Sequence, residues 1–323
     1  MNMPLVSIKD MTLRFTGART VSAVNDISLE LAHGEVLGLL GESGSGKSAT
    51  LRALLRLYPQ RSAQTGGSIQ IDGQDVLSLK GSALEQYRGG TVSMVFQEPG
   101  VAFDPVYTIG QQIVQTIRAH ENISAGAAAE QALALLERVQ IPQAARRFHA
   151  YPHELSGGMR QRAMIALALS CKPKLLLADE PTTALDATVQ IQILLLLRAL
   201  QKEMNMSVIF VTHDIGAAVE VADRIAVMYA GRIVEQGRVA DVVQRPMHPY
   251  TAGLLASTVG AADKGRPLQA VAGSPPDMSN PPVGCAFAAR CGHASAQCEV
   301  QPLVREVQGR TVMCWHPLNQ VAA

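Results

Sequence analysis

A glycine-rich segment at residues 41–48 carries the side chains best suited to bind phosphate. It reads G-E-S-G-S-G-K-S and matches the pattern G-x-x-x-x-G-K-[S/T]. Glycines in such a loop let backbone N–H groups surround phosphate oxygens without a clashing Cβ atom, and a following helix adds the positive end of its dipole. Lys47 would reach the β- and γ-phosphates, and the Ser48 hydroxyl would hold Mg²⁺. The alternative is a merely flexible glycine loop.

Two adjacent carboxylates, Asp179 and Glu180, follow the apolar run Leu175–Ala178. If this run is a strand of a parallel sheet, both carboxylates lie at its carboxyl end, where ligands bind in such sheets. Asp179 would then orient Mg²⁺, and Glu180 would polarise the water that attacks the γ-phosphate, which is the role of a general base. Alone, the pair would be interpreted as a solvated turn. Together with residues 41–48, it predicts the second half of a nucleotide site.

A second helix terminus that could bind an anion is predicted at residues 155–161. Ser156, Gly157 and Gly158 precede a helix expected over Met159–Ser170, and a helix N-terminus attracts negative charge. One nucleotide cannot easily be cradled by this terminus if the glycine-rich loop already covers it. For Ser-Gly-Gly alone, the alternative is an ordinary N-capped helix.

The segment Leu155–Gln161 resembles the signature sequence of ATP-binding cassette (ABC) ATPases, and on it the chain is identified as a member of this family. The resemblance covers residues 5 to about 237. It implies a P-loop NTPase that hydrolyses ATP with Mg²⁺. It also implies a head-to-tail dimer, in which each signature closes over the ATP that the partner holds.

The remaining positions of the family pattern occur in order along the chain. Gln97 matches the glutamine that contacts Mg²⁺ and water and couples the site to a membrane partner. Thr183–Asp186 resembles the loop at the dimer seam, although many family members have Ser where this chain has Thr183. His213 matches the histidine that holds the γ-phosphate, and Phe15 lies about where an aromatic residue stacks on adenine. A lone Phe or His would otherwise be a structural residue.

The resemblance therefore implies three groups of site residues. The catalytic residues are Glu180, His213 and Gln97. The Mg²⁺ ligands are Ser48, Gln97 and Asp179. The residues that contact ATP are Phe15, Gly41, Ser43, Gly44, Ser45, Gly46, Lys47, Ser48, Asp179, Ser156, Gly157, Gly158, Gln161 and Asp186.

The C-terminal part of the chain resembles the tail of ATPases that serve di- and oligopeptide importers. The resemblance rests on three segments, His248–Thr251, Pro282–Phe287 and Arg290–Cys291. The wider group also carries nickel, opines and glutathione, so the transported molecule is left open. The loop after Gln97 departs from the peptide-importer pattern, because Glu98 and Asp104 stand where Asp and Asn are commoner.

Four of the five cysteines lie within the last forty residues, namely Cys285, Cys291, Cys298 and Cys314. Their spacing, C-x5-C-x6-C-x15-C, lacks the C-x2-C knuckle typical of structural zinc. Four thiolates could nevertheless hold a [4Fe–4S] cluster, as the resemblance to cluster-binding relatives implies. Zinc, with His293 or His316 as a substitute ligand, and free thiols are the alternatives.

The apolar segments predict the elements that must hold these residues. Short strands are expected at three places, Val36–Leu40, Lys174–Ala178 and Ser207–Thr212. Residues 69–73 and 225–235 each resemble an antiparallel hairpin. Between about residues 110 and 169 the chain is rich in Ala, Gln, Leu and Glu, which predicts several helices. Strands that alternate with helices are typical of an α/β fold with a mainly parallel sheet.

Pattern and resemblance together predict an α/β P-loop fold. It has a RecA-like core, an antiparallel β subdomain, an inserted helical subdomain and a small C-terminal extension. The ABC nucleotide-binding domain is expected over residues 1–240, with its helical subdomain at about 98–170. The extension with the four cysteines is expected over residues 241–323.

Composition excludes several other classes of protein. Hydrophobic residues make up 47% and charged residues 17% of the 323, which excludes wholesale disorder. The formal net charge of +1 gives no hint of nucleic acid as a partner. The longest apolar runs, such as Met164–Cys171, fall short of the ~18 residues that span a bilayer. No signal peptide is visible, so a cytoplasmic location is expected.

We expect the ATP-hydrolysing subunit of a bacterial importer for di- or oligopeptides or a related small solute. It would be peripheral on the cytoplasmic face of the inner membrane. The partners implied are a second ABC ATPase subunit, identical or distinct, two transmembrane permease subunits and a periplasmic or extracellular solute-binding protein. Two alternatives stay open: a soluble ABC ATPase of DNA repair or iron–sulfur assembly, and a tail that acts as a redox sensor.

Overall fold

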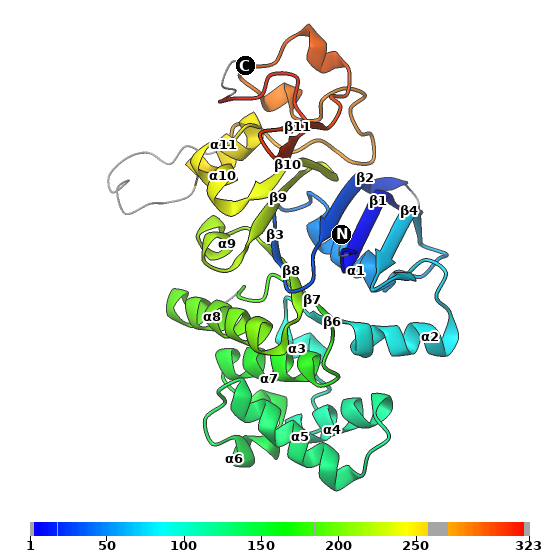
Figure 1. The fold of residues 1–323 in the computed structure, drawn as a ribbon, viewed down its shortest axis with the longest axis vertical. Helices are drawn as coiled ribbons and strands as arrows, with labels where there is room; N and C mark the ends of the chain where they lie inside the picture. The colour runs from blue at the N-terminus through cyan, green and yellow to red at the C-terminus, as the bar shows by residue number, and fades with distance from the viewer. Residues whose placement is uncertain (1–2, 18, 184, 258–270, 320–323) are drawn as a thin grey trace. The chain divides into compact units, whose positions relative to one another are not determined.

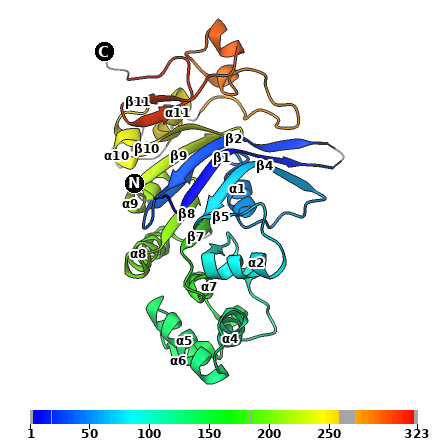
Figure 2. The same ribbon diagram turned by 45° about the vertical axis from the view of Figure 1, so that its right-hand side comes forward.

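The computed structural model describes residues 3–17, 19–183, 185–257 and 271–319. Two compact units make up the chain (Figures 1 and 2). The first comprises Met1–Leu5, Ala32–Glu35 and Ser78–Phe210, and the second comprises Val6–Leu31, Val36–Leu77 and Val211–Ala323. Ala184 of the predicted seam loop and residues 258–270 and 320–323 of the predicted extension lie outside the described residues.

Helices dominate the first unit, as predicted for residues 110–169 (Figure 1). They are α2 (Gly81–Gln86), α3 (Pro99–Ala102), α4 (Ile109–His120), α5 (Ala125–Arg138), α6 (Ala144–Phe148), α7 (Gly157–Leu169) and α8 (Ala187–Met204). Buried residues on α5, such as Ala128, Ala132 and Leu136, are four positions apart. This spacing places them on one face of the helix, which packs against α4.

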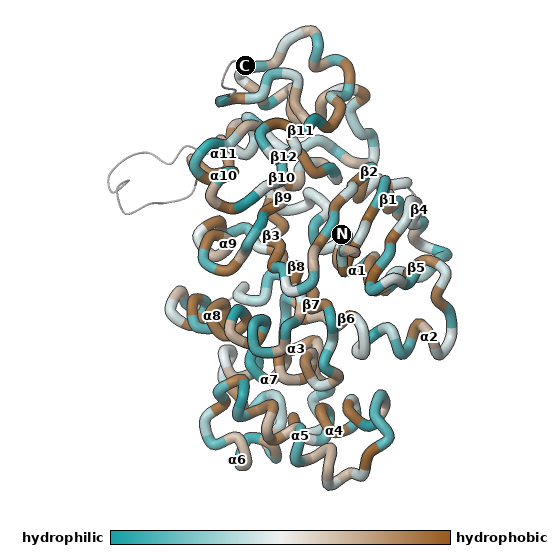
Figure 3. Tube along the Cα trace, viewed as in Figure 1, coloured by the Kyte–Doolittle hydropathy of each residue, from teal (hydrophilic) through white to brown (hydrophobic). Residues whose placement is uncertain are grey.

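Three neighbouring strands lie in the first unit: β6 (Val92–Val95), β7 (Leu175–Asp179) and β8 (Ser207–Thr212). The last two residues of β8 fall in the second unit. β6 and β7 are parallel, with Val92 opposite Leu175. β7 and β8 are buried along their whole length and mostly apolar (Figure 3), as strands covered on both faces are. Strands are confirmed at both predicted places, but β7 begins and ends one residue later than predicted, at Leu175 and Asp179.

The second unit contains an antiparallel sheet, as predicted. Its strands in spatial order are β2 (Val21–Leu31), β1 (Val6–Phe15), β4 (Ala63–Ile71) and β5 (Gln74–Asp75). The predicted hairpin joins β4 to β5 at Asp72 and Gly73. Both residues have positive φ, 51° and 74°, which is the backbone that a two-residue hairpin turn requires.

A second set of strands in this unit lies in the order β11 (Arg305–Val307), β12 (Arg310–Val312), β10 (Arg232–Arg238), β9 (Arg224–Tyr229) and β3 (Val36–Leu40). β3 and β9 are parallel, and the others pair antiparallel. The α-helices described in this unit are α1 (Lys47–Leu54), α9 (Ile215–Val221), α10 (Val239–Gln244) and α11 (Pro249–Ala256). Among the helices described, none combines the length and apolarity that crossing a bilayer requires.

His248 is a buried residue at the start of α11. Its ring Nδ1 accepts a hydrogen bond from Tyr250 N at 3.0 Å and so caps the helix. Its own backbone N–H donates to Glu235 Oε2 at 2.8 Å. Burial lowers the pKa of His248 to about 3, so the ring is neutral in the folded chain at neutral pH.

Replacing His248 with Asn is expected to flatten the pH dependence of stability. The unfolded chain protonates this ring near pH 6.5 and the folded chain only near pH 3, so the free energy of unfolding falls as the pH drops below 6.5. Between pH 7.5 and 5, the parent protein should lose about 2 kcal/mol more than His248→Asn in urea unfolding. Asn keeps a side-chain oxygen for the cap. If the free energy of unfolding falls equally in both proteins, His248 is not buried as a neutral ring.

Glu235 changes stability in the opposite direction. Burial raises the pKa of its carboxyl, although the backbone N–H groups of His248 and Met247 and the charge of Arg310 oppose this. The carboxyl of Glu235 is therefore protonated at a higher pH in the folded chain than in the unfolded chain. A fall in pH through this range favours the folded state. Since Glu235 is present in both proteins, the difference between their unfolding free energies isolates His248.

Candidate functional site

The glycine-rich segment forms the turn between β3 and α1 and needs glycine at two positions. Gly41 has φ +148°, and a Cβ atom there would collide with the backbone oxygen of Met228. Gly46 has φ +103°, and a Cβ atom there would lie 2.5 Å from the backbone oxygen of Ala23. A larger residue at either position would push the loop out of place.

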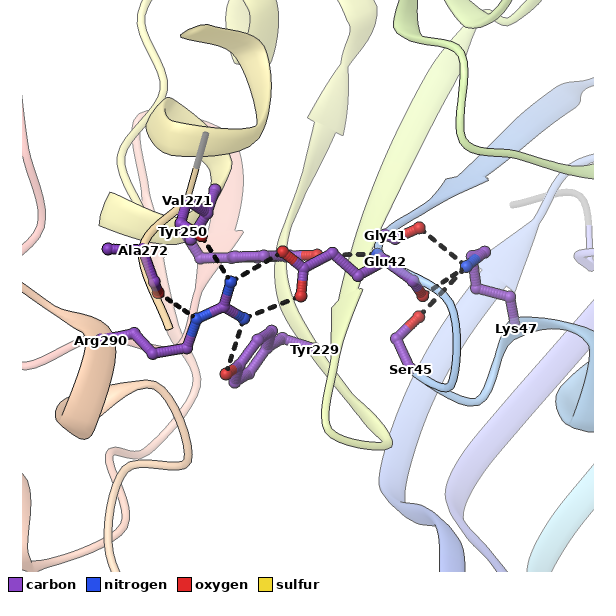
Figure 4. Close-up of polar contacts among 9 residues, drawn as sticks. All are labelled: Gly41, Glu42, Ser45, Lys47, Tyr229, Tyr250, Val271, Ala272 and Arg290. Atoms are coloured by element: carbon purple, nitrogen blue, oxygen red, sulfur yellow. Dashed lines mark hydrogen bonds and ion pairs between the residues drawn. The ribbon is translucent and has the colours of Figure 1, made fainter. Parts of the chain in front are cut away.

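The ammonium group of Lys47 lies inside this loop (Figure 4). Its Nζ donates hydrogen bonds of 2.8 Å to the backbone oxygens of Gly41 and Glu42, and one of 3.3 Å to Ser45 Oγ. Only 5% of Lys47 is exposed. The loop therefore holds the ammonium group where the phosphates of a nucleotide would meet it.

The start of α1 fits a phosphate group. The helix begins at Lys47 with Gly46 as its N-cap, and no side chain of the described residues caps it. The first N–H groups of a helix attract phosphate, and Ser48 lies in this first turn. Ser43 and Gly44 are exposed on the loop. Loop, helix terminus and ammonium group together fit the triphosphate of ATP, and a hydroxyl at position 48 is of the type that holds its Mg²⁺.

Two further predicted site residues of the second unit are accessible to a ligand. His213 is exposed directly after β8, in a turn where Asp214 N donates to Thr212 Oγ1 at 3.0 Å. Phe15 is half-buried at the end of β1, and its ring meets that of Tyr58 edge to face at 4.8 Å between centroids. Neither side chain is fully buried in a core. Their contacts with the γ-phosphate and adenine stay predictions.

In the first unit, Gln97 and Glu180 are in contact although 83 positions separate them. Gln97 Nε2 donates to Glu180 Oε2 at 3.1 Å, and Thr183 Oγ1 donates to the same oxygen at 2.8 Å. Two donors on one carboxylate oxygen fix the direction in which the group points, which a general base requires. Thr183 thus supplies the hydroxyl that a serine would supply at this position.

The two adjacent carboxylates at the end of β7 lie in different environments. Asp179, the last residue of the strand, is fully buried, whereas Glu180 is partly exposed. Glu180 has φ +46°, a left-handed conformation that costs a residue other than glycine about 1–3 kcal/mol. Thr183 N donates to the Glu180 backbone oxygen at 3.2 Å and helps to hold this turn. Such strain is concentrated at functional sites.

The signature segment lies at the start of α7. Ser156 Oγ accepts a hydrogen bond from Met159 N at 3.3 Å, so the helix begins at Gly157 and not at Met159 as predicted. Ser156 is exposed, and Gly157 and Gly158 are half-buried. Gln161 is only 2% exposed, and its Nε2 has no hydrogen-bond partner within the described part of the chain. The side chain of Gln161 is thus buried in the isolated chain, and its contact with ATP stays a prediction.

The predicted seam residue Asp186 lies at the start of α8. It is exposed, and its Oδ1 accepts hydrogen bonds from Thr188 N at 3.1 Å and Val189 N at 3.0 Å. A Cβ atom on Gly158 would lie 3.0 Å from Val189 Cγ1, so glycine allows α7 to start close to α8. Asp186 and the signature are thus carried by neighbouring helix ends of the first unit.

The four C-terminal cysteines lie near one another. Cys285 N donates to the backbone oxygen of Cys298 at 2.9 Å. Burial raises the pKa of Cys314 to about 11, and it also raises the pKa of Cys285 and Cys291. Over the residues that the structure describes, no three His, Cys, Asp or Glu side chains are arranged to hold a metal ion. The predicted [4Fe–4S] cluster and its zinc alternative therefore lack structural support.

The contacts of Glu42 leave no local signal in the sequence. Arg290 binds its carboxylate and the Tyr250 hydroxyl binds its backbone N–H (Figure 4). Because 248 positions separate Glu42 from Arg290, no local pattern could reveal this pair. The hydrogen bond from Thr183 to Glu180 is likewise not evident from the sequence, where Thr183 resembles only a residue of the dimer seam.

Two protein-family models and several curated proteins match the chain. The model "ABC transporter" matches residues 24–183, and the model "Oligopeptide/dipeptide transporter, C-terminal region" matches residues 234–298. A putative peptide import ATP-binding protein of Brucella abortus is 47% identical over 96% of this chain and 94% of the relative. A probable D,D-dipeptide transport ATP-binding protein of Escherichia coli is 44% identical over 99% of both chains. The oligopeptide transport ATP-binding protein of Escherichia coli is 42% identical over 98% of this chain and 94% of that one.

Solved structures of ATP-binding cassettes share the fold. A dimeric cassette in a post-hydrolysis state, bound to ADP and Pi, is 28% identical, with a TM-score of 0.65 over 72% of this chain and 98% of that chain. A component of an ABC transporter complex from Clostridium perfringens has the same TM-score at 24% identity, over 75% of this chain and 92% of that one. The predicted fold class is confirmed.

Proposed function

The chain belongs to the ABC transporter family, and we propose that it is the ATP-binding and ATP-hydrolysing subunit of an importer for di- or oligopeptides. The observation that carries this proposal is a single chain that resembles peptide import ATP-binding proteins over almost its whole length, including their C-terminal region at residues 234–298. These relatives do not favour the alternative of a soluble ATPase in DNA repair or iron–sulfur assembly.

ATP binding is assigned first to the glycine-rich loop. Lys47 and the backbone of residues 41–48 bind the β- and γ-phosphates, and Phe15 stacks on adenine. Ser48, Gln97 and Asp179 are assigned to Mg²⁺, which neutralises phosphate charge when bound. The placement of Lys47 inside the loop supports the phosphate assignment.

Hydrolysis is assigned to Glu180 as general base. It takes the proton of the attacking water while the water oxygen bonds to the γ-phosphorus and the bond from that phosphorus to the β–γ bridging oxygen breaks, releasing ADP and phosphate. The hydrogen bonds from Gln97 and Thr183 to the Glu180 carboxylate support this role, because they orient it. His213 is assigned to hold the γ-phosphate.

The second anion-binding terminus is assigned to the nucleotide of a partner ATPase. Ser156, Gly157, Gly158 and Gln161 of one subunit then contact the ATP that the other subunit holds, and Asp186 lies at the seam. The exposed position of Ser156 supports this assignment. The partner is a second copy of this chain or a similar ATPase.

We place the chain on the cytoplasmic face of the inner membrane, bound to two permease subunits, with a solute-binding protein that delivers the substrate. Its nucleotide-binding domain spans residues 1–240, with the helical subdomain at about 98–170, and the extension spans residues 241–323. The family matches at residues 24–183 and 234–298 support this division. No metal cluster forms part of the proposal.

The proposed function is tested in proteoliposomes that contain the chain with its cognate permease subunits. Adding the solute-binding protein loaded with a di- or oligopeptide is expected to stimulate ATP hydrolysis and to drive peptide uptake. Unloaded binding protein is the control. If the complex hydrolyses ATP but no di- or oligopeptide stimulates it, the peptide assignment is wrong. If the chain does not bind MgATP, the whole proposal fails.

A further inference from the structure

Glu42, the second residue of the phosphate-binding loop, forms an ion pair with Arg290 of the C-terminal region (Figure 4). Arg290 Nη1 donates to Glu42 Oε2 at 2.8 Å, and Nη2 donates to Oε1 at 3.0 Å. This is the bidentate arrangement, which is stronger and more directional than a single contact. The side chain of Arg290 is 5% exposed and that of Glu42 is 26% exposed, so the pair is not an ordinary surface salt bridge.

The guanidinium group of Arg290 is itself held in place by its surroundings. Its Nε donates to the backbone oxygen of Ala272 at 2.7 Å, and Nη2 donates to that of Val271 at 3.0 Å. Its Nη1 also donates to the Tyr229 hydroxyl at 3.2 Å, and the group lies 5.9 Å from the centre of the Phe287 ring. A guanidinium fixed in this way loses little conformational freedom when it binds a carboxylate.

The backbone of Glu42 is bound at the same time. Its N–H donates to the Tyr250 hydroxyl at 2.8 Å, and its carbonyl oxygen accepts hydrogen bonds from Lys47 Nζ at 2.8 Å and from Ser45 N at 3.2 Å. Figure 4 shows the carboxylate directed toward Arg290 and the carbonyl directed toward Lys47. A single loop residue thus connects the C-terminal region with the lysine assigned to the phosphates.

The charge of Glu42 makes this connection important for a nucleotide. An unpaired carboxylate on the loop would repel the phosphates of ATP, and the repulsion would be strong because the group is only partly exposed. Pairing with Arg290 neutralises this charge and keeps the carboxylate directed away from Lys47. The five hydrogen bonds to Glu42 also restrain the loop in the conformation that surrounds the ammonium group.

We propose that Arg290 is a positioning residue of the nucleotide site, through which the C-terminal region controls the affinity of the chain for ATP. Arg290 acts through Glu42: it neutralises the carboxylate and holds the phosphate-binding loop. This inference rests on the proposed function, because it requires that the loop binds ATP. Residues 271–290 of the C-terminal region then contribute to nucleotide binding.

The test is a double-mutant cycle on the full-length chain, with equilibrium binding of MgATP as the readout. Arg290→Gln should raise the Kd for MgATP about 10-fold, because Glu42 loses its partner. Adding Glu42→Gln to that variant should restore most of the lost affinity, because no unpaired carboxylate is left. In ATPase assays of the reconstituted complex, Arg290→Gln should raise KM much more than it lowers kcat.

The control is Arg305→Gln, which removes the same charge from the same region. Arg305 is exposed and stacks on Trp315 at 5.1 Å, so its loss should leave MgATP binding unchanged. Thermal unfolding without nucleotide shows whether each variant is folded. The inference is wrong if folded Arg290→Gln binds MgATP like the parent protein, or if the double variant binds as weakly as Arg290→Gln. If the parent protein itself does not bind MgATP, the proposed function fails instead.

Discussion

Glu180→Gln is expected to lower ATP hydrolysis by about 100-fold to 10,000-fold while MgATP still binds, since loss of a general base has effects of this size. Gln has nearly the shape of Glu and keeps a side-chain oxygen that can accept the hydrogen bond from Thr183 Oγ1 or Gln97 Nε2. What it lacks is the ability to take a proton from water. Phosphate release by the assembled complex measures hydrolysis, and equilibrium binding to the full-length chain measures affinity.

Glu203→Gln is the matched control for this prediction. Glu203 is an exposed residue of α8 in the same unit, in an ion pair with Arg138 at 3.4 Å, so its change should leave turnover at the parent level. The Glu180 variant should also accumulate a closed ATP-bound dimer, because hydrolysis no longer separates the subunits. Unchanged turnover in Glu180→Gln would show that another group activates the water.

The parts of the site that could be predicted from the sequence depend on local patterns. The loop at residues 41–48 is defined by glycine, lysine and serine at fixed spacing, and β3 and β8 have the predicted bounds because each is a short apolar run between turn residues. Asp179 and Glu180 could be placed at a strand end for the same reason. Local side-chain chemistry and hydrophobicity are sufficient for such elements.

The features that sequence analysis missed depend on tertiary contacts or on backbone detail. The pair of Glu42 and Arg290 joins two segments far apart in the chain, and the bond from Thr183 to Glu180 depends on a left-handed turn at Glu180. The cysteine spacing was compatible with several ligand sets, and burial of the thiols could not be read from spacing. The start of α7 was misplaced by two residues because Ser156 caps the helix directly before Gly157.

Ser156→Arg is expected to abolish hydrolysis that depends on the dimer while the isolated chain binds MgATP as before. Ser156 is exposed at the start of α7, and its Oγ caps Met159 N. In the proposed dimer an arginine there would fill the space assigned to the partner's nucleotide, and misplacement of reacting groups by about 1 Å can cost 100-fold in rate. A loss of at least about 100-fold is therefore expected when phosphate release is measured with the complete complex.

Ser124→Arg separates this effect from the loss of a helix cap. Ser124 is an exposed N-cap in the same unit, where its Oγ accepts a hydrogen bond from Ala127 N at 3.2 Å. Both substitutions remove a cap worth about 1 kcal/mol and add the same side chain, but only position 156 lies in the signature. If both variants lose hydrolysis equally, the cause is damage to the helical unit. If Ser156→Arg instead prevents the isolated chain from binding MgATP, the signature belongs to the site of its own subunit, and a nucleotide shared between two subunits is excluded.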